Sequence, residues 1–549
     1  MPLHRVYGPP GCGKTTYLRR QALLAADRYG ERAVMVASLT RAAAHEVAGR
    51  IPTFPPQNIG TLHAFAYRSL GRPALAETPD GIKAWNADSP PHLRLEASSR
   101  DTDYPDLEPV AATPGSSAAD LHNAYSILRA RRADRSTYPP DVERFAQRWE
   151  DWKRQTGRRD FADLIDVAAD ELDAAPGDPA VFMVDEAQDM SAAEMRLVHR
   201  WGAAAGHLVI VGDPDQNLYE WRGSDPAEFG RGDAESEHVL EQTYRVPELA
   251  HSYAVDWIER TLGRRPIAYR PTNVRGDLAR YGAQYRDRGA VAALVDRCAA
   301  AAEEGRSSMI LASCGFMLNP VAAQMRADGV PFHNPYRPTH GGWNPLRGAR
   351  RVLPLLRGDA DAWGADAAEW SWRDVWSFVE PMRAEWFARG GKALLERRAG
   401  PDQFGNTDAA FAPIGDDGMR LLYDLLVEDA FGALVSGDVS WWESSLLASW
   451  KPKVAYACEV ARRRGAASLG EEPRVILGTI HSVKGGEADD VYVFPDLSDA
   501  AMREWTGREE QRAAIRRLFY VAFTRTRSGL YLCAPSSPRA VRLPPPPNI

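Results

Sequence analysis

The sequence predicts an α/β protein built on parallel sheets, and three observations predict it. A glycine-rich loop follows the first short apolar segment, which is the usual order of a strand, a phosphate-binding loop and a helix. A later apolar segment, 181–184, runs directly into a pair of acids. Further short apolar segments alternate with helical stretches along most of the chain. Polar groups at the ends of strands in such an alternation are typical of open α/β sheets.

Composition sets the broad class. The 549 residues are 44% hydrophobic and 26% charged, as in ordinary globular proteins, and they suffice for several domains. No apolar run approaches the roughly 20 residues of a membrane span, and we expect no cleavable leader before the loop. The five cysteines are scattered, so we expect reduced thiols, a cytoplasmic location and no zinc site. A net charge of −7 argues against a general basic coat but allows a local basic groove.

The opening loop, GPPGCGKT from Gly8 to Thr15, fits the pattern G-x-x-x-x-G-K-[ST]. We expect a strand at 3–6 before it and a helix at 16–26 after it. Glycines let backbone N–H groups close around a phosphate chain, and the helix N-terminus adds positive potential. Lys14 would reach the outer phosphates, and the Thr15 hydroxyl would hold Mg²⁺. The expected nucleotide-binding residues here are Gly8, Pro9, Pro10, Gly11, Cys12, Gly13, Lys14, Thr15 and Thr16.

The second strand–helix unit carries a candidate contact to nucleic acid. Residues 33–37 predict a strand, and residues 42–50 predict the helix that follows it. Thr40 and Arg41 lie between the two. Hydroxyl side chains at this point suit either a phosphate contact or a helix cap, and the cap is the commoner explanation.

The next segment, residues 60–65 with the sequence GTLHAF, also turns from strand into helix. His63 could contact nucleic acid or simply close the start of the helix. Residues 71–120 are rich in Pro, Ser, Asp and Glu with weak periodicity, so we expect a loop or irregular insertion. Residues 121–172 are helical in pattern, with a helix start at Asp160.

Residues 181–184 predict a buried strand that ends at Asp185 and Glu186. Asp185 can hold Mg²⁺, directly or through water, and Glu186 can orient and deprotonate an attacking water. The alternative is an acidic helix start favoured by the helix dipole. The phosphate-binding loop in the same chain makes that alternative weaker.

Residues 208–211 predict the next strand, which ends in GDPDQNLYEWRG. Gln216 can sense a terminal phosphate, while Tyr219 and Trp221 with Arg222 could stack on bases. Taken alone, these two aromatic residues would more often belong to the core. After a strand at 238–240, an aromatic beside an arginine, Tyr244–Arg245, could stack on adenine and reach a phosphate, or form a surface turn.

The C-terminal half repeats the alternation around a helical stretch. Residues 341–472 hold nine of the 16 tryptophans, which we expect to be mostly core. Residues 516–527 predict a helix ending in a basic cluster. The remaining expectations are strands at 308–312, 475–479, 491–494 and 530–533, a helix at 320–327, and an extended, uncovered tail at 544–547.

Eight motifs in order resemble the UvrD/Rep/PcrA-type superfamily 1 helicases: GPPGCGKTT, TLHAF, DFADLI, VDEAQD, VGDPDQNLYEWRG, LEQTYR, GTIHSVKGGE and LFYVAFTRTR. The resemblance implies an α/β fold with two RecA-like P-loop domains and mainly helical insertions. The division it implies is a first motor domain at 1–70 and 176–230 with an insertion at 71–175, a second at 231–340 and 473–543 with a helical insertion at 341–472, and a Pro-rich tail at 544–549.

The resemblance also implies residue roles around ATP and Mg²⁺. Lys14, Glu186 and Gln216 would act in catalysis, with Arg245 and Arg525 as arginine fingers from the second domain. Tyr244 would stack on the base and Glu487 would touch the ribose. The expected DNA-contacting residues are Thr40, Arg41, Thr61, His63, Tyr219, Trp221, Arg222, Thr479, His481 and Lys484.

The expected function is that of an ATP-dependent DNA helicase that moves 3′ to 5′ on single-stranded DNA and unwinds tailed duplexes. We expect it to act in repair, replication or recombination, with a protein loading or repair partner and without a membrane. One alternative is a DNA-stimulated ATPase that remodels nucleoprotein within a larger complex without unwinding. Another is a nucleotide-gated binding module. Departures from the family pattern are the lack of an adenine-reading glutamine before Gly8, Gly486 and Ala488 around the ribose contact, and Thr243 in place of asparagine.

Overall fold

The computed structural model describes residues 2–39, 44, 47–49, 51–96, 117–337, 341–346, 349, 370–400 and 408–546. The chain divides into two compact units. The first comprises residues 1–280, 480–487 and 495–549, and the second comprises residues 281–479 and 488–494. In the described residues, no helix is long and apolar enough to cross a lipid bilayer.

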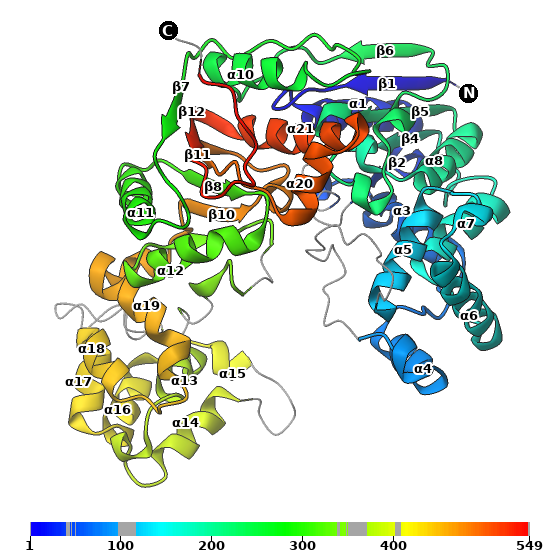
Figure 1. Ribbon diagram of the computed structural model, residues 1–549. Coiled ribbons are helices and arrows are strands. Elements are labelled where there is room, and N and C mark those ends of the chain that lie inside the picture. The colour runs from blue at the N-terminus through cyan, green and yellow to red at the C-terminus, as the bar shows by residue number, and fades with distance from the viewer. Residues whose placement is uncertain are drawn as a thin grey trace. The chain divides into compact units, whose positions relative to one another are not determined.

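A six-stranded parallel sheet forms the centre of the first unit (Figure 1). Its strands, in spatial order, are β3 (Ile59–Thr61), β2 (Val34–Ser38), β4 (Val181–Val184), β5 (His207–Gly212), β1 (Leu3–Tyr7) and β6 (Ser236–Val239). β2 and β4 are buried along their whole length. Such continuous apolar runs are typical of parallel strands that are covered on both faces.

Helices cover both faces of this sheet. On one face Leu18 and Ala22 of α1 (Lys14–Tyr29) pack in one core with Val36, Met183 and other strand residues. On the other face Trp201 of α8 (Ala192–Ala204) packs edge-on against Phe182. Because all strands are parallel, the residues that follow β1, β2, β4 and β5 meet at one edge of the sheet, where the predicted motifs lie.

The helical insertion of the first unit contains α4 (Pro79–Asp88), α5 (Ala118–Ala130), α6 (Pro140–Thr156) and α7 (Phe161–Glu171). The prediction of a loop over 71–120 is therefore wrong at α4. Thr78 caps this helix and Pro79 occupies its first turn. Its apolar pattern is short, but Trp85 is fully buried against Trp149 and Trp152, so tertiary packing stabilises the helix.

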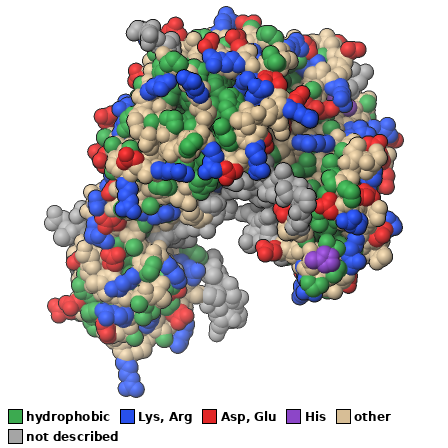
Figure 2. All heavy atoms as spheres, in the orientation of Figure 1, with side chains coloured by type: hydrophobic (Ala, Val, Ile, Leu, Met, Phe, Trp, Pro, Cys, Tyr) green, Lys and Arg blue, Asp and Glu red, His purple; other side chains and the backbone are tan. Residues whose placement is uncertain are grey.

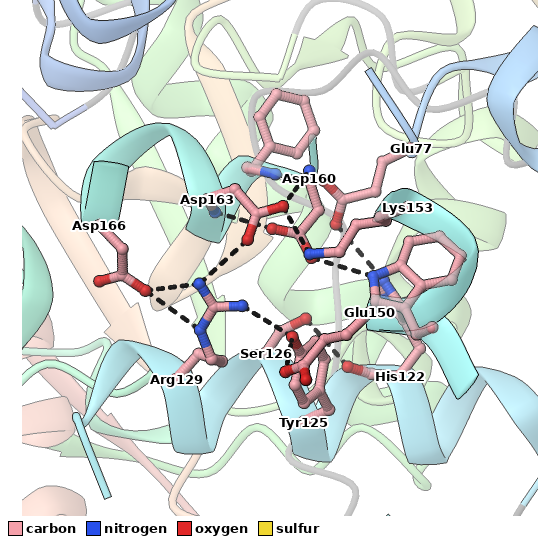
Figure 3. A network of polar contacts seen from close by, with 12 residues as sticks. Glu77, His122, Tyr125, Ser126, Arg129, Glu150, Lys153, Asp160, Asp163 and Asp166 are labelled. Atoms are coloured by element: carbon pink, nitrogen blue, oxygen red, sulfur yellow. Dashed lines mark hydrogen bonds and ion pairs between the residues drawn. The ribbon is translucent and has the colours of Figure 1, made fainter. Parts of the chain in front are cut away.

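The start of α7 agrees with the prediction, because Asp160 forms a capping box with Asp163 there. α3 (Leu62–Ser69) follows β3 directly, as predicted. Charged side chains from α5, α6 and α7 form a network inside the insertion, and Glu77 joins it from the segment before α4 (Figure 3).

The rest of the first unit consists of α9 (Pro226–Phe229), α10 (Glu248–Ile258), β7 (Asp277–Tyr281), α20 (Asp499–Thr506), α21 (Glu509–Phe523) and β12 (Thr526–Cys533). The predicted helix at 516–527 ends at Phe523, so its basic cluster continues beyond the helix. The tail was expected to be uncovered, which is wrong at Pro544, because the Tyr253 hydroxyl donates a hydrogen bond of 3.0 Å to its carbonyl.

The second unit contains four parallel strands in the order β11 (Ala488–Val493), β8 (Ser308–Ala312), β10 (Val475–Thr479) and β9 (Phe332–His333). The α/β prediction is thus confirmed in both units. The helices of the second unit include α11 (Arg288–Glu303) and α12 (Asn319–Ala327).

The tryptophan-rich stretch folds as helices α13 (Trp372–Val379), α14 (Gly391–Ala399), α15 (Asp408–Phe411), α16 (Gly415–Leu425), α17 (Glu428–Ser436), α18 (Val439–Ser444) and α19 (Lys451–Arg464). Trp370 and Trp442 are completely buried, and other tryptophans pack partly buried around the same cluster. The prediction that these residues are mostly core is confirmed for the described residues.

Candidate nucleotide and nucleic-acid sites

The loop between β1 and α1 has the backbone that a phosphate-binding loop needs. Gly11 and Gly13 have φ values of 73° and 75°, a region that glycine adopts readily. A Cβ atom on Gly8 would lie 2.3 Å from Cγ of Lys14, so this position also requires glycine. Helix α1 begins at Lys14, and its N-terminal N–H groups therefore adjoin the loop.

Lys14 lies over its own loop, and its side chain is buried. Its ammonium group donates a hydrogen bond of 2.9 Å to the carbonyl of Gly8. It lies 3.9 Å from Oε1 of Glu186, at the outer limit of an ion pair. The positive charge is thus held at the loop without a close carboxylate.

Asp185 and Glu186 follow β4 at the same sheet edge. Asp185 is buried, and its Oδ1 accepts a hydrogen bond of 3.0 Å from the N–H of Glu186. Glu186 has a φ of 51°, a left-handed conformation that is uncommon for a residue with a side chain and is frequent at functional sites. Burial works to raise the pKa of Glu186, but the charges of Lys14 and Lys484 hold it at about 2. Glu186 is therefore ionised at neutral pH.

Gln216 connects two parts of the first unit that are far apart in sequence. Its Nε2 donates to Asp213 at 2.7 Å, and its Oε1 accepts from Nη2 of Arg525 at 3.1 Å. Arg525 is buried and its Nε donates to the carbonyl of Val521 at 2.9 Å. Two predicted catalytic residues, 309 positions apart, are therefore in direct contact.

Tyr244 and Arg245 contact the phosphate-binding loop. The N–H of Tyr244 donates to the carbonyl of Gly11 at 2.9 Å, while its side chain is 79% exposed. A Cβ on Gly11 would lie 2.8 Å from Cβ of Arg245. Nη1 of Arg245 lies 3.6 Å from Oε2 of Glu487, and its buried Nε has no hydrogen-bond partner among the described residues. A donor left unpaired beside this loop suits an anion.

The other residues predicted to bind the nucleotide lie in the same loop and helix. Thr15 and Thr16 lie in the first turn of α1, and Cys12 is buried within the loop, where burial raises the pKa of its thiol to about 12. Among the described residues, no group of three His, Cys, Asp or Glu side chains could hold a metal ion by itself. Thr15 and Asp185 offer the oxygen ligands that Mg²⁺ prefers, and Mg²⁺ commonly takes its other ligands from nucleotide phosphates and water.

Of the residues predicted to contact DNA, several lie near one cavity of the first unit. It measures about 200 Å³, and its lining includes His63, Trp221 and Arg222 together with Arg129 and Phe161 of the insertion. Burial lowers the pKa of His63, whose Nδ1 lies 3.6 Å from Glu194. Thr61 accepts the capping hydrogen bond of α3 from Ala64.

Lys484 contacts both Asp189, which lines this cavity, and Gln216, one of the predicted catalytic residues. The ammonium group of Lys484 pairs with Asp189, donates to the carbonyl of Gln216 at 2.8 Å and lies 5.3 Å from the centre of the Tyr219 ring. Tyr219 is buried, and its ring centre is 6.3 Å from that of Trp221. Burial raises the pKa of Asp189 to about 6, with Lys484 opposing the shift.

Other predicted DNA contacts lie elsewhere or outside the described residues. His481 follows β10 and belongs to the first unit, whereas Thr479 ends β10 in the second. Thr40 and Arg41 lie outside the described residues. On the face seen in Figure 2, Lys and Arg side chains are interspersed with acidic ones.

Sequence reasoning left two groups of residues without a role. Phe161 and Arg129 line the cavity, and the motif DFADLI contained the signal for Phe161. Asp189 and Asp213 pair with Lys484 and Gln216, and both lie inside motifs that were used for their neighbours.

The comparisons with known proteins agree with this geometry. The model of the UvrD/REP helicase N-terminal domain matches residues 4–235, and that of the UvrD-like helicase C-terminal domain matches residues 462–537. Together the two cover more than half of the chain. The chain therefore belongs to the UvrD/Rep helicase family, and the resemblance seen in the motifs is confirmed.

Individual relatives are distant. The chain is 27% identical to ATP-dependent DNA helicase UvrD2 of Mycobacterium tuberculosis over 290 residues, which are 46% of this chain and 41% of the relative. It is 26% identical to DNA helicase II of Haemophilus influenzae over 275 residues, 44% of this chain and 36% of the relative. It is 29% identical to ATP-dependent DNA helicase PcrA of Staphylococcus aureus over 144 residues, 24% and 20% of the two chains. The chain thus spans less than half the length of these relatives.

Proposed function

We propose that this protein is an ATP-dependent DNA helicase that couples ATP hydrolysis to 3′ to 5′ movement on single-stranded DNA and to duplex unwinding. The observation that carries the proposal is the Gln216 side chain, whose amide joins Asp213 beside the phosphate-binding loop to Arg525. A residue that senses the terminal phosphate and an arginine that stabilises the transition state are then a single hydrogen-bonded unit. The names of the relatives, ATP-dependent DNA helicase and DNA helicase II, support the activity, while the proposed direction rests on the family resemblance of the motifs.

The proposed nucleotide chemistry assigns one task to each side chain. Lys14 binds the outer phosphates, Thr15 and Asp185 bind Mg²⁺, and Tyr244 stacks on the base. Mg²⁺, when bound, neutralises charge that develops on the phosphates. Glu186, which is ionised in this structure, accepts the proton of an attacking water.

The proposed division of the chain into motor domains rests on the family resemblance and differs from the two compact units, the first of which also contains residues 231–280, 480–487 and 495–549. Residues 1–70 and 176–230 form the first RecA-like motor domain, and residues 231–340 and 473–543 form the second. The stretches 71–175 and 341–472 are insertions. The proposed contact to DNA bases is formed by Tyr219, which is buried, together with Trp221, Arg222 and His63 at the cavity. Stacking on an aromatic ring contributes about 1–3 kcal/mol per base.

The test is ATP hydrolysis with and without single-stranded DNA, with Lys14→Ala as the matched control. We expect hydrolysis to rise strongly with DNA and to be lost in the variant. Hydrolysis that does not respond to DNA would overturn the proposal in favour of a gated binding module. Strand separation on duplexes with 3′ or 5′ tails then follows: we expect it on 3′ tails, and movement without separation would favour a nucleoprotein-remodelling ATPase.

A further inference from the structure

The loop that carries Tyr219 and Trp221 is held from two sides at Glu220. The carboxylate of Glu220 forms an ion pair with Arg517 of α21, and both side chains are largely buried. The backbone carbonyl of Glu220 accepts a hydrogen bond of 2.8 Å from Nη2 of Arg131, the residue that ends α5. Glu220, which lies between the two aromatic residues, is thus bonded both to α21 and to the insertion.

The packing around this loop leaves it little freedom. Gly223, directly after the loop, has a φ of 102°, and a Cβ atom there would lie 2.8 Å from Cβ of Ala130. The close approach fixes the end of the loop against α5. The start of the loop is fixed by Gln216, which accepts a hydrogen bond from Arg525.

The segment 216–220 is therefore contacted at its two ends by α21, through Arg517, and by Arg525 just beyond that helix. Arg517 lies within α21, and Arg525 follows its C-terminal end at Phe523. Arg517 and Arg525 are eight positions apart, so about two helical turns separate the ion pair at Glu220 from the hydrogen bond at Gln216.

The Glu220–Arg517 ion pair differs from a surface ion pair because its charges are largely shielded from solvent. Burial raises the pKa of Glu220, with Arg517 and Arg131 opposing the shift and Asp225 adding to it. Burial raises the pKa of Glu504 of α20, and the charge of Glu220 raises it further. Without Arg517 this group of acids would lose its main positive partner, and a buried carboxylate without one is costly.

We propose that Glu220 is a positioning residue that couples DNA bound at Tyr219 and Trp221 to Arg525, through Arg517 and α21. The inference rests on the proposed function. It predicts that the ion pair sets how strongly DNA accelerates ATP hydrolysis, while DNA binding itself is carried by the neighbouring aromatic side chains.

The experiment compares Glu220→Gln, Arg517→Gln and the double variant in ATP hydrolysis with and without single-stranded DNA. We expect each single change to reduce the DNA-stimulated rate about tenfold, with the DNA-independent rate and the affinity for DNA within twofold of wild type. If the two residues act as one unit, the double variant loses no more than either single variant. Glu509→Gln is the matched control, because Glu509 pairs with the neighbouring Arg516 of the same helix.

Several outcomes would overturn the inference. One is DNA stimulation of ATP hydrolysis by Glu220→Gln within twofold of wild type. The others are additive losses of stimulation in the double variant, or a loss in Glu509→Gln equal to that in Glu220→Gln. Denaturation midpoints of all variants separate loss of coupling from loss of folding, and a loss of stimulation that follows the midpoints also contradicts the proposal. A wild-type protein without DNA stimulation would instead refute the proposed function itself.

Discussion

The first unit contains two clusters of buried charged side chains, which differ in how closely opposite charges pair. In the insertion, the ammonium group of Lys153 lies 2.5 Å from both Asp160 and Asp163. Arg129 bridges Asp163 at 3.1 Å and Asp166 at 2.5 Å (Figure 3). Every one of these positive groups faces carboxylates at hydrogen-bonding distance, which is the condition under which buried charge stabilises a fold.

At the phosphate-binding loop the pairing is incomplete. Lys14 is 3.9 Å from the nearest oxygen of Glu186 and donates to a neutral carbonyl instead. Nε of Arg245 is buried without a hydrogen-bond partner among the described residues. The comparison indicates that the insertion network holds the fold together, whereas the loop region keeps positive charge available for a ligand.

The largest expected effect distinguishes Arg525, which contacts Gln216, from Arg129 of the insertion network. Arg525→Lys removes the planar group that contacts Gln216, and we expect ATP hydrolysis to fall by about 10³–10⁵-fold, the usual contribution of an arginine finger. Arg129→Lys, the matched change in the insertion, should lower stability to denaturant while leaving DNA-independent hydrolysis within a few fold. Rate measurements and urea titrations of both variants check this, and a catalytic loss shared by the two would break the comparison.

The next effect concerns the acid after β4. Glu186→Gln keeps the shape of the side chain but removes its ability to accept a proton, so we expect hydrolysis to fall by about 10²–10⁴-fold with nucleotide binding retained. Single-turnover hydrolysis and nucleotide titration provide the measurement. Unchanged hydrolysis would remove Glu186 from the mechanism.

A smaller expected effect is a change in the protein's stability with pH, caused by the charged side chains of the insertion. Burial works to raise the pKa of Asp160, but Lys153 and Arg129 hold it at about 2. Relative to an unfolded pKa near 3.9, this contributes about 2–3 kcal/mol above pH 4, which is lost as the pH falls through 2. For Glu77, burial and Asp160 raise the pKa to about 8. Its contribution is full at acidic pH and is lost as the pH rises through 8.

Glu77→Gln tests the alkaline side of this profile. Glutamine stays neutral, and its oxygen can still accept the hydrogen bond of 2.7 Å from the N–H of Phe161. We expect the stability of the variant to decline less than that of wild type between pH 6 and about 9. Denaturation midpoints across this range give the answer, and parallel profiles would show that Glu77 does not titrate there.

Sequence reasoning worked best where local pattern and local structure coincide. The strands and helices around the phosphate-binding loop were predictable, because a glycine loop, buried strands and capping residues such as Asp160 act within a few positions. Helix α4 was not, since Trp85 finds its partners Trp149 and Trp152 some 60 residues later. Contacts such as Gln216 with Arg525 depend on the chain's full path, so the family resemblance indicated their roles but no local pattern indicated their contact.

One measurement tests the comparison most directly: hydrolysis rates and denaturation midpoints of Lys14→Ala and Lys153→Ala, measured side by side. The two lysines are both buried, and they differ in how closely carboxylates pair with them. We expect Lys14→Ala to abolish DNA-stimulated hydrolysis at a nearly unchanged denaturation midpoint. For Lys153→Ala we expect a stability loss of about 3–5 kcal/mol, as for breaking a buried pair. The reverse pattern, with Lys14→Ala unfolding the protein and Lys153→Ala leaving its stability intact, would contradict the different roles of the two clusters.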